Sequence, residues 1–142
     1  MIRTHLRTAA LALALASATS LTSFSAVAPA RAEAEAPQAR LVKYEDVQDL
    51  GALASEGKTV VFFFATWCPN CILTLTELST KWSEVEPDLT LVIADYDQET
   101  ALKAKYGVTY QDTFVLLDSS GDAAKLWNAG GVAGLNENTR AQ

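Results

Sequence analysis

Histidine and methionine are almost missing from this sequence of 142 residues: it has one of each, His5 and Met1, both at the start of the chain. Downstream of them, catalysis by Ser-His or Cys-His pairs, zinc sites of cysteine and histidine, and copper sites of histidine and methionine are excluded. We therefore expect no metal centre and no bound cofactor. Chemistry is left to two cysteines, the carboxylates, the lysines and the aromatic side chains.

Positive charge is scarce as well. The chain has 11 Lys and Arg against 17 Asp and Glu, and three of the bases lie before residue 33. Residues 33–142 therefore carry a formal charge of −9, from 8 basic and 17 acidic side chains. This excess of acid repels phosphate backbones and anionic lipid surfaces, which argues against nucleic-acid binding and peripheral membrane docking. The length fits one globular domain, and we expect a monomer.

The first 32 residues have the layout of a secretory signal peptide. A basic start at residues 3–7 is followed by residues 8–30, which contain no charge. Ala30-Arg31-Ala32 places small residues where signal peptidase requires them, with cleavage before Glu33. An uncleaved membrane anchor is the alternative, because 23 uncharged residues can span a bilayer. We favour cleavage, which predicts a periplasmic or secreted protein whose cysteines meet an oxidising solution.

Residues 33–39 are rich in Ala, Glu and Pro, and we interpret them as a linker before a domain that covers residues 40–142. Apolar and β-branched runs predict strands over 41–44, 59–65, 89–94, 114–117 and 124–127. Apolar residues three and four apart predict helices over 47–57, 69–87 and 100–106, the last capped by Gly107. The sequence does not decide whether a final helix forms over 135–140. This order of elements predicts an α/β fold with a mixed sheet and helices on both faces.

The two cysteines lie at a junction between a predicted strand and a predicted helix, in the segment Cys68-Pro69-Asn70-Cys71. A thiol that opens a helix sits among unpaired N–H groups at the positive end of the helix dipole, which stabilises its thiolate. We therefore expect Cys68 to be the exposed nucleophile. Cys71, one turn further on, is placed to resolve a mixed disulfide. Pro69 suits the first helical turn, and Asn70 can present its amide near the sulfur.

Two plainer interpretations of the cysteine pair stay open. A fixed structural disulfide is possible, although so short a loop removes little entropy from the unfolded chain and would stabilise weakly. The other interpretation is that the two cysteines form half of a metal site, but the sequence lacks the two further soft ligands that such a site needs. Reversible dithiol chemistry is the interpretation that we favour.

The chain resembles the thioredoxin family, in its extracytoplasmic thiol–disulfide branch, over residues 40–130. The resemblance is carried by the strand Val60–Phe64, by Trp67-Cys68-Pro69-Asn70-Cys71 and by Tyr106-Gly107-Val108 ahead of a strand at Thr113–Leu117. It implies a thioredoxin-like fold and a catalytic dithiol of Cys68 and Cys71. It also implies protein thiol and disulfide substrates, and an electron partner that is a membrane-bound or soluble thiol protein. The substrate-binding residues that it implies are Trp67, Pro69, Asn70 and Thr113.

Three positions depart from the family pattern. The family places a cis-proline just before the strand that faces the cysteines, and here that position holds Asp112, whose peptide bond we expect to be trans. Phe62 stands where cytoplasmic thioredoxins bury an acid, and Ile93 stands at the position of its lysine partner. We consider two roles for Asp112: a solvated turn residue, or a carboxylate near the sulfurs that exchanges a proton with them in place of the acid missing at Phe62.

The sequence supports two functional hypotheses. The first is an extracytoplasmic thiol–disulfide oxidoreductase, with Cys68, Cys71 and Asp112 as its catalytic residues. We favour a reductant, because the Pro-Asn dipeptide brings no histidine to stabilise a thiolate. The alternative is a redox-silent binding module that keeps the fold together with a structural Cys68–Cys71 disulfide.

Overall fold

The sheet at the centre of the domain is mixed, with strands in the order β1-β3-β2-β4-β5. The computed structural model describes residues 37–140. Within them the elements follow the predicted order: β1 (Arg40–Lys43), α1 (Leu50–Glu56), β2 (Lys58–Phe64), α2 (Pro69–Thr80), β3 (Leu89–Asp95), α3 (Thr100–Tyr106), β4 (Thr113–Leu117), β5 (Ala123–Asn128) and α4 (Gly131–Arg140). The predicted signal peptide and residues 33–36 of the predicted linker lie outside the described residues.

β2 is the central strand and is buried on both faces. It pairs in parallel with β3 and antiparallel with β4, while β1 and β5 form the two edges. Its side chains alternate between two cores, since Val60 and Phe62 belong to one and Val61 and Phe63 to the other. A strand that is covered on both faces needs an unbroken run of apolar residues. The apolar run at residues 59–65 predicted this strand for that reason.

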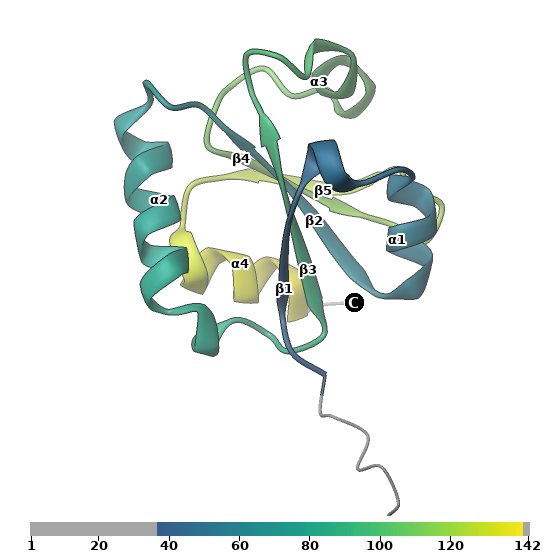
Figure 1. The fold of residues 1–142 in the computed structure, drawn as a ribbon, viewed down its shortest axis with the longest axis horizontal. Coiled ribbons are helices and arrows are strands. Elements are labelled where there is room, and N and C mark those ends of the chain that lie inside the picture. Colours follow the sequence, from purple (N-terminus) through teal and green to yellow (C-terminus); the bar gives the residue numbers. More distant parts are fainter. Residues whose placement is uncertain (1–36, 141–142) are drawn as a thin grey trace, which may run out of the picture. The chain divides into compact units, whose positions relative to one another are not determined.

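Helices cover both faces of the sheet, as predicted. α2 and α4 lie side by side on one face of the sheet (Figure 1). Cys71 and Leu78 of α2 and Val132 and Leu135 of α4 belong to the core on that face. The opposite core contains side chains from α1 and α3. Within residues 37–140, none of the helices has the length and apolar character needed to cross a bilayer.

Several element ends differ from the prediction for local reasons. α1 begins at Leu50 because the side chain of Asp49 accepts hydrogen bonds from the N–H groups of Gly51 and Ala52, which caps the helix there. α2 ends at Thr80, seven residues before Pro87. The Thr80 hydroxyl bonds the carbonyl oxygen of Thr76, and such local bonds compete with helix continuation.

The chain after α2 still reaches the core through a short 3₁₀ turn, η2 (Trp82–Glu84). Trp82 packs against the core and donates its indole N–H to the carbonyl of Ala39 at 3.1 Å, so the last residue of the predicted linker is anchored to the domain.

The final helix, which the sequence left undecided over 135–140, is present and is longer. α4 begins at Gly131 and buries Val132 and Leu135.

Asn136 ties α4 to the chain segment that follows η2. Its side-chain oxygen accepts from the N–H of Glu86 at 3.0 Å, and its amide donates to the carbonyl of Glu84 at 2.7 Å. We predict that Asn136→Ala lowers the free energy of unfolding by about 1–3 kcal/mol, because it leaves two backbone groups unpaired. Asn138→Ala is the matched control, since the Asn138 amide bonds only within its own helix. Urea unfolding measures both variants, and equal losses would show that the tether contributes nothing.

Candidate functional site

The cysteine pair lies where β2 passes into α2. Cys68 is the N-cap residue of α2 and Pro69 occupies the first turn, where its missing N–H costs nothing. The Sγ atom of Cys68 accepts a hydrogen bond from the backbone N–H of Cys71 at 3.3 Å. The first sulfur therefore stands at the positive end of the helix dipole, as the sequence predicted.

Both sulfurs are free thiols and both are buried. Cys71 is 0% exposed, and Cys68 keeps only 2% of its surface, so the expectation of an exposed Cys68 is wrong in degree. The reason is that the N-cap position faces into the core of β2 and α2, so that Cys68 and Cys71 belong to the same apolar cluster. Burial, with smaller contributions from a hydrogen bond to Cys68 and the charges of Cys68 and Asp112, raises the pKa of Cys71 to about 12.

The side chains around the buried sulfurs form an exposed and largely apolar surface. Pro69 and Asn70 are exposed beside Cys68. Four larger apolar side chains keep between 47% and 68% of their surface exposed in the segment around the cysteines and in the loop before β4: Trp67, Ile72, Leu73 and Tyr110. A surface of this kind is suited to contact with a protein substrate.

Trp67 is held in place by an acid that the sequence analysis missed. Its indole N–H donates to the carboxylate of Asp97 at 2.7 Å. Asp97 follows the end of β3, which pairs in parallel with β2. The carboxyl ends of parallel strands meet at one edge of the sheet, and this was the only signal that could have brought Asp97 beside Trp67.

Asp112 is buried, which contradicts the interpretation as a solvated turn residue. It is 4% exposed and has a φ of 58°, a left-handed conformation that Asp tolerates better than most residues. Its N–H donates to the carbonyl of Phe63 and its own carbonyl accepts from Ala129, both at 3.0 Å. Residues 37–140 contain no cis peptide bond, so the predicted trans bond before Asp112 is confirmed.

The carboxylate of Asp112 faces α2. Burial raises its pKa, against a smaller opposing hydrogen bond from the side chain of Thr74, one turn beyond Cys71. Its charge in turn contributes to the raised pKa of Cys71. The charge of Asp112 therefore acts on the buried thiol of Cys71.

The side chain of Thr113 makes its hydrogen bonds within the domain, to the loop before β4 and to β5. Its hydroxyl donates to the carbonyl of Tyr110 at 2.7 Å and accepts from the amide of Asn128 at 2.6 Å. Thr113 is 5% exposed, and its hydroxyl already makes both of these hydrogen bonds within the domain. The sequence analysis placed Thr113 among the substrate-binding residues, and its hydrogen bonds instead fix the start of β4 behind Asp112.

The apolar cluster that contains Cys68 and Cys71 also contains a column of stacked aromatic rings. Phe62 stacks on Phe114 with ring centroids 4.4 Å apart, and Phe114 stacks on Trp127 at 5.4 Å. Phe62 pairs in register with Ile93, so both positions at which the family resemblance implies a charged pair are apolar. Asp112 is the buried carboxylate of the described residues.

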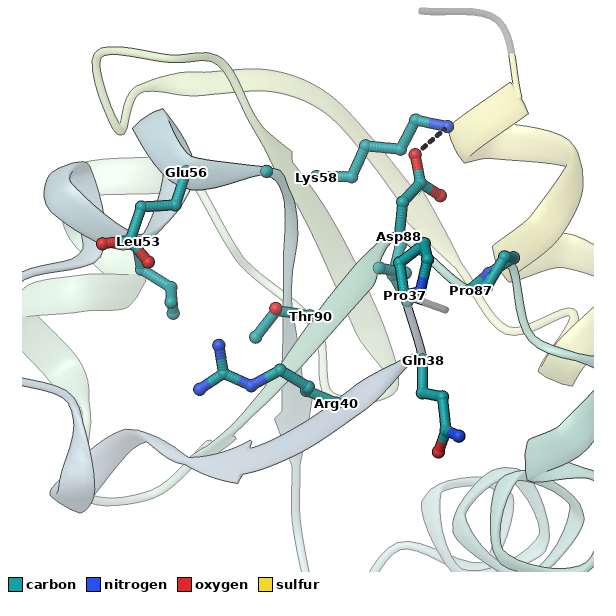
Figure 2. Close-up of a pocket in the computed structure, with 11 residues that line it drawn as sticks. Pro37, Gln38, Arg40, Leu53, Glu56, Lys58, Pro87, Asp88 and Thr90 are labelled. Atoms are coloured by element: carbon teal, nitrogen blue, oxygen red, sulfur yellow. Dashed lines mark ion pairs between the residues drawn. The ribbon is translucent and has the colours of Figure 1, made fainter. Parts of the chain in front are cut away.

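A cavity of about 680 Å³ lies at the opposite edge of the sheet, where β2 and β3 begin (Figure 2). Its rim carries an ion pair between Lys58 and Asp88 at 3.1 Å, and Arg40 also lines the cavity. Cys68 follows the other end of β2. This cavity is therefore separate from the thiol site.

Comparison with known proteins identifies the family. The family model described as thioredoxin matches residues 42–139. The chain belongs to the thioredoxin family. A thioredoxin-2 of Pyricularia oryzae is 33% identical over 76 residues, which are 54% of this chain and 43% of that protein, so the chain spans less than half of that relative. The thioredoxin Asp f 28 of Aspergillus fumigatus is 34% identical over 89 residues, 61% of this chain and 79% of that protein.

Solved structures agree with the sequence comparison. The X-ray structure of Fasciola hepatica thioredoxin matches with a TM-score of 0.58 and 28% identity, and the match covers 72% of this chain and 99% of that one. The predicted thioredoxin-like fold is thus confirmed. Family membership, together with two cysteines at Cys-x-x-Cys spacing, makes the protein a thiol–disulfide oxidoreductase.

We predict that iodoacetamide at about pH 8 labels Cys68 before Cys71. A pKa of about 12 leaves roughly one molecule in ten thousand with a Cys71 thiolate at that pH, and the thiolate is the reactive form. Peptide mass spectrometry after limiting reagent reports which sulfur is labelled. In the matched control, Cys68→Ser, labelling should slow by at least about tenfold. Preferential label on Cys71 in the wild type would reverse the two roles.

Proposed function

We propose that the protein is an extracytoplasmic reductase of protein disulfides, with Cys68 as the attacking and Cys71 as the resolving thiol. The observation that carries this proposal is the pair's asymmetry: the sulfur of Cys68 caps α2 and accepts a hydrogen bond, while Cys71 is fully buried with a pKa raised to about 12. Two thiols with such different environments suit consecutive steps of exchange. The exposed apolar surface around Trp67 would contact the substrate.

The proposed reductase direction rests on the weak stabilisation of the reduced cysteine pair. Strong disulfide oxidants of this kind owe their potential to a stabilised reduced form. Within the described residues no cationic side chain contributes to the pKa of Cys71, and the charge of Asp112 opposes a negative charge there. The helix N-terminus at Cys68 is the one stabilising feature of the reduced pair that we find in them, which favours donation of electrons.

The proposed location rests on the sequence alone. Residues 1–32 have a signal-peptide pattern, and we propose a mature, monomeric protein that begins at Glu33 and works in the periplasm or outside the cell. Its electron partner would then be a membrane-bound or soluble thiol protein. The high acidic charge of residues 33–142 is consistent with a soluble substrate rather than a nucleic acid or an anionic membrane.

Insulin reduction tests the activity. Wild-type protein with dithiothreitol should accelerate insulin precipitation, and Cys68→Ser should abolish the acceleration. Equilibration with glutathione should give a reduction potential nearer to about −270 mV than to about −120 mV. If wild type and Cys68→Ser behave alike, the protein is the redox-silent binding module instead.

Export is tested separately. Expression of the full chain in a secreting host should yield a soluble extracytoplasmic protein whose N-terminal sequence begins at Glu33, because the Ala-Arg-Ala segment satisfies signal peptidase. Edman sequencing of the purified product reports the start. A membrane-bound product that still carries Met1 would show that residues 8–30 form an anchor.

A further inference from the structure

Two buried side-chain polar atoms of the described residues have no hydrogen-bond partner, the indole nitrogen of Trp127 and one oxygen of Asp112, and only the oxygen belongs to an acid. Oδ1 is buried and has no hydrogen-bond partner within the described residues. Leaving a buried carboxylate oxygen unpaired costs free energy, and native structures keep few such atoms. An unpaired buried acceptor whose charge acts on the Cys71 thiol is suited to receiving the proton of that thiol.

The backbone holds this carboxylate in one place. Both backbone groups of Asp112 are used, one by Phe63 of β2 and the other by Ala129 after β5. The backbone of Asp112 is therefore fixed on both sides, and its carboxylate lies close enough to the side chain of Thr74 on α2 for that side chain to affect its pKa. Thr74 lies one turn after Cys71 on the same buried face of α2.

The other elements packed around Asp112 bring no competing charge to it within the described residues. β2 contributes Phe62 and Phe63, and the amide of Asn128 at the end of β5 is taken by Thr113. Glu77, further along α2, lies against Gly131 and pairs with Lys81. The buried face of α4 carries no titratable side chain: Gly131, Val132, Leu135, Asn136 and Thr139. On α2 the titratable groups near Asp112 are the two cysteines.

We propose that Asp112 is the catalytic base that accepts the proton of Cys71 when a mixed disulfide is resolved. Before this step, Cys68 is joined to a substrate sulfur. The Cys71 thiol gives its proton to the Asp112 carboxylate, and the Cys71 sulfur attacks Sγ of Cys68. The Cys68–Cys71 bond forms as the Cys68–substrate bond breaks, so the cysteine pair is oxidised and the substrate sulfur leaves reduced, as a thiolate. Asp112 passes its proton to water, which protonates the leaving thiolate.

Burial makes such a base necessary. Cys71 is 0% exposed, so water and hydroxide do not reach its thiol directly. Its pKa of about 12 leaves very little thiolate at neutral pH. A neighbouring carboxylate removes the proton during the attack and avoids the need for a preformed thiolate.

The proposal can be separated from a purely electrostatic role, because the two predict opposite signs for Asp112→Asn. If Asp112 acts only through its charge, the amide lowers the pKa of Cys71 and resolution becomes faster. If Asp112 is the base, resolution becomes slower. Asn is close to Asp in shape and tolerates the same left-handed backbone, so the loop is kept.

Stopped-flow reaction with excess dithiobis(nitrobenzoate) measures the step directly. The first release of coloured thiolate reports attack by Cys68, and the second, independent of reagent concentration, reports resolution by Cys71. We expect wild-type resolution to rise with pH as Asp112 ionises and then to level off. In Asp112→Asn the second phase should be on the order of 10- to 100-fold slower at about pH 7 and should keep rising with pH.

Three controls accompany this measurement. Cys71→Ser should lack the second phase, and Asp88→Asn, the same chemical change at the far edge of the sheet in Figure 2, should leave both phases unchanged. Asp112→Gly also fits the backbone, and added formate should restore its second phase by supplying a small carboxylate.

The outcomes are distinct. An Asp112→Asn protein that resolves at the wild-type rate or faster would overturn the assignment, as would an Asp112→Gly protein that formate leaves unchanged. The proposal rests on dithiol exchange but not on the reductase direction. A wild-type protein without either phase would overturn both this role and the proposed activity, whereas a normal first phase preserves the activity.

Discussion

The burial of β2 on both faces is the constraint on which the site depends. Neighbouring strands satisfy its backbone on either side, and two cores hold its alternating side chains. Its end at Phe64 is therefore fixed in space. Only three residues then separate it from Cys68, the N-cap of α2. A rigid strand followed by a rigid helix thus sets the position of the first sulfur, and the helix sets the second one turn later.

Close packing gives the two cysteines different environments, but it also disfavours the negative charge that a thiol needs in order to react. The cysteines share an apolar cluster with stacked aromatic rings, and Phe62 and Ile93 stand where polar side chains could have entered from the sheet. Such surroundings disfavour the ionised form of a thiol. The one buried carboxylate among the described residues enters from the start of β4 instead, so proton chemistry is supplied from the side of the loop rather than from beneath the sulfurs.

Features with local causes could be predicted from the sequence, and features with distant partners could not. α3 with its Gly107 cap and the β4–β5 hairpin follow from turn residues within a few positions. The bonds of Trp67 to Asp97 and of Asn136 to Glu86 join residues 30 and 50 positions apart, and no periodicity encodes them. Thr74 is a polar side chain on the buried face of α2, and its partner Asp112 lies 38 positions further along the chain.

The replacement of proline at position 112 changes more than one side chain. A proline fixes φ near −65° and has no N–H, whereas Asp112 has a φ of 58° and donates its N–H to Phe63. The loop is held by a hydrogen-bond network instead of a ring, and that network draws on β2, on Ala129 and on the Thr113–Asn128 pair. The β4–β5 hairpin is therefore part of the site. Its pairing keeps the Asp112 carboxylate against α2, so a change at Asn128 would move that carboxylate without touching either cysteine.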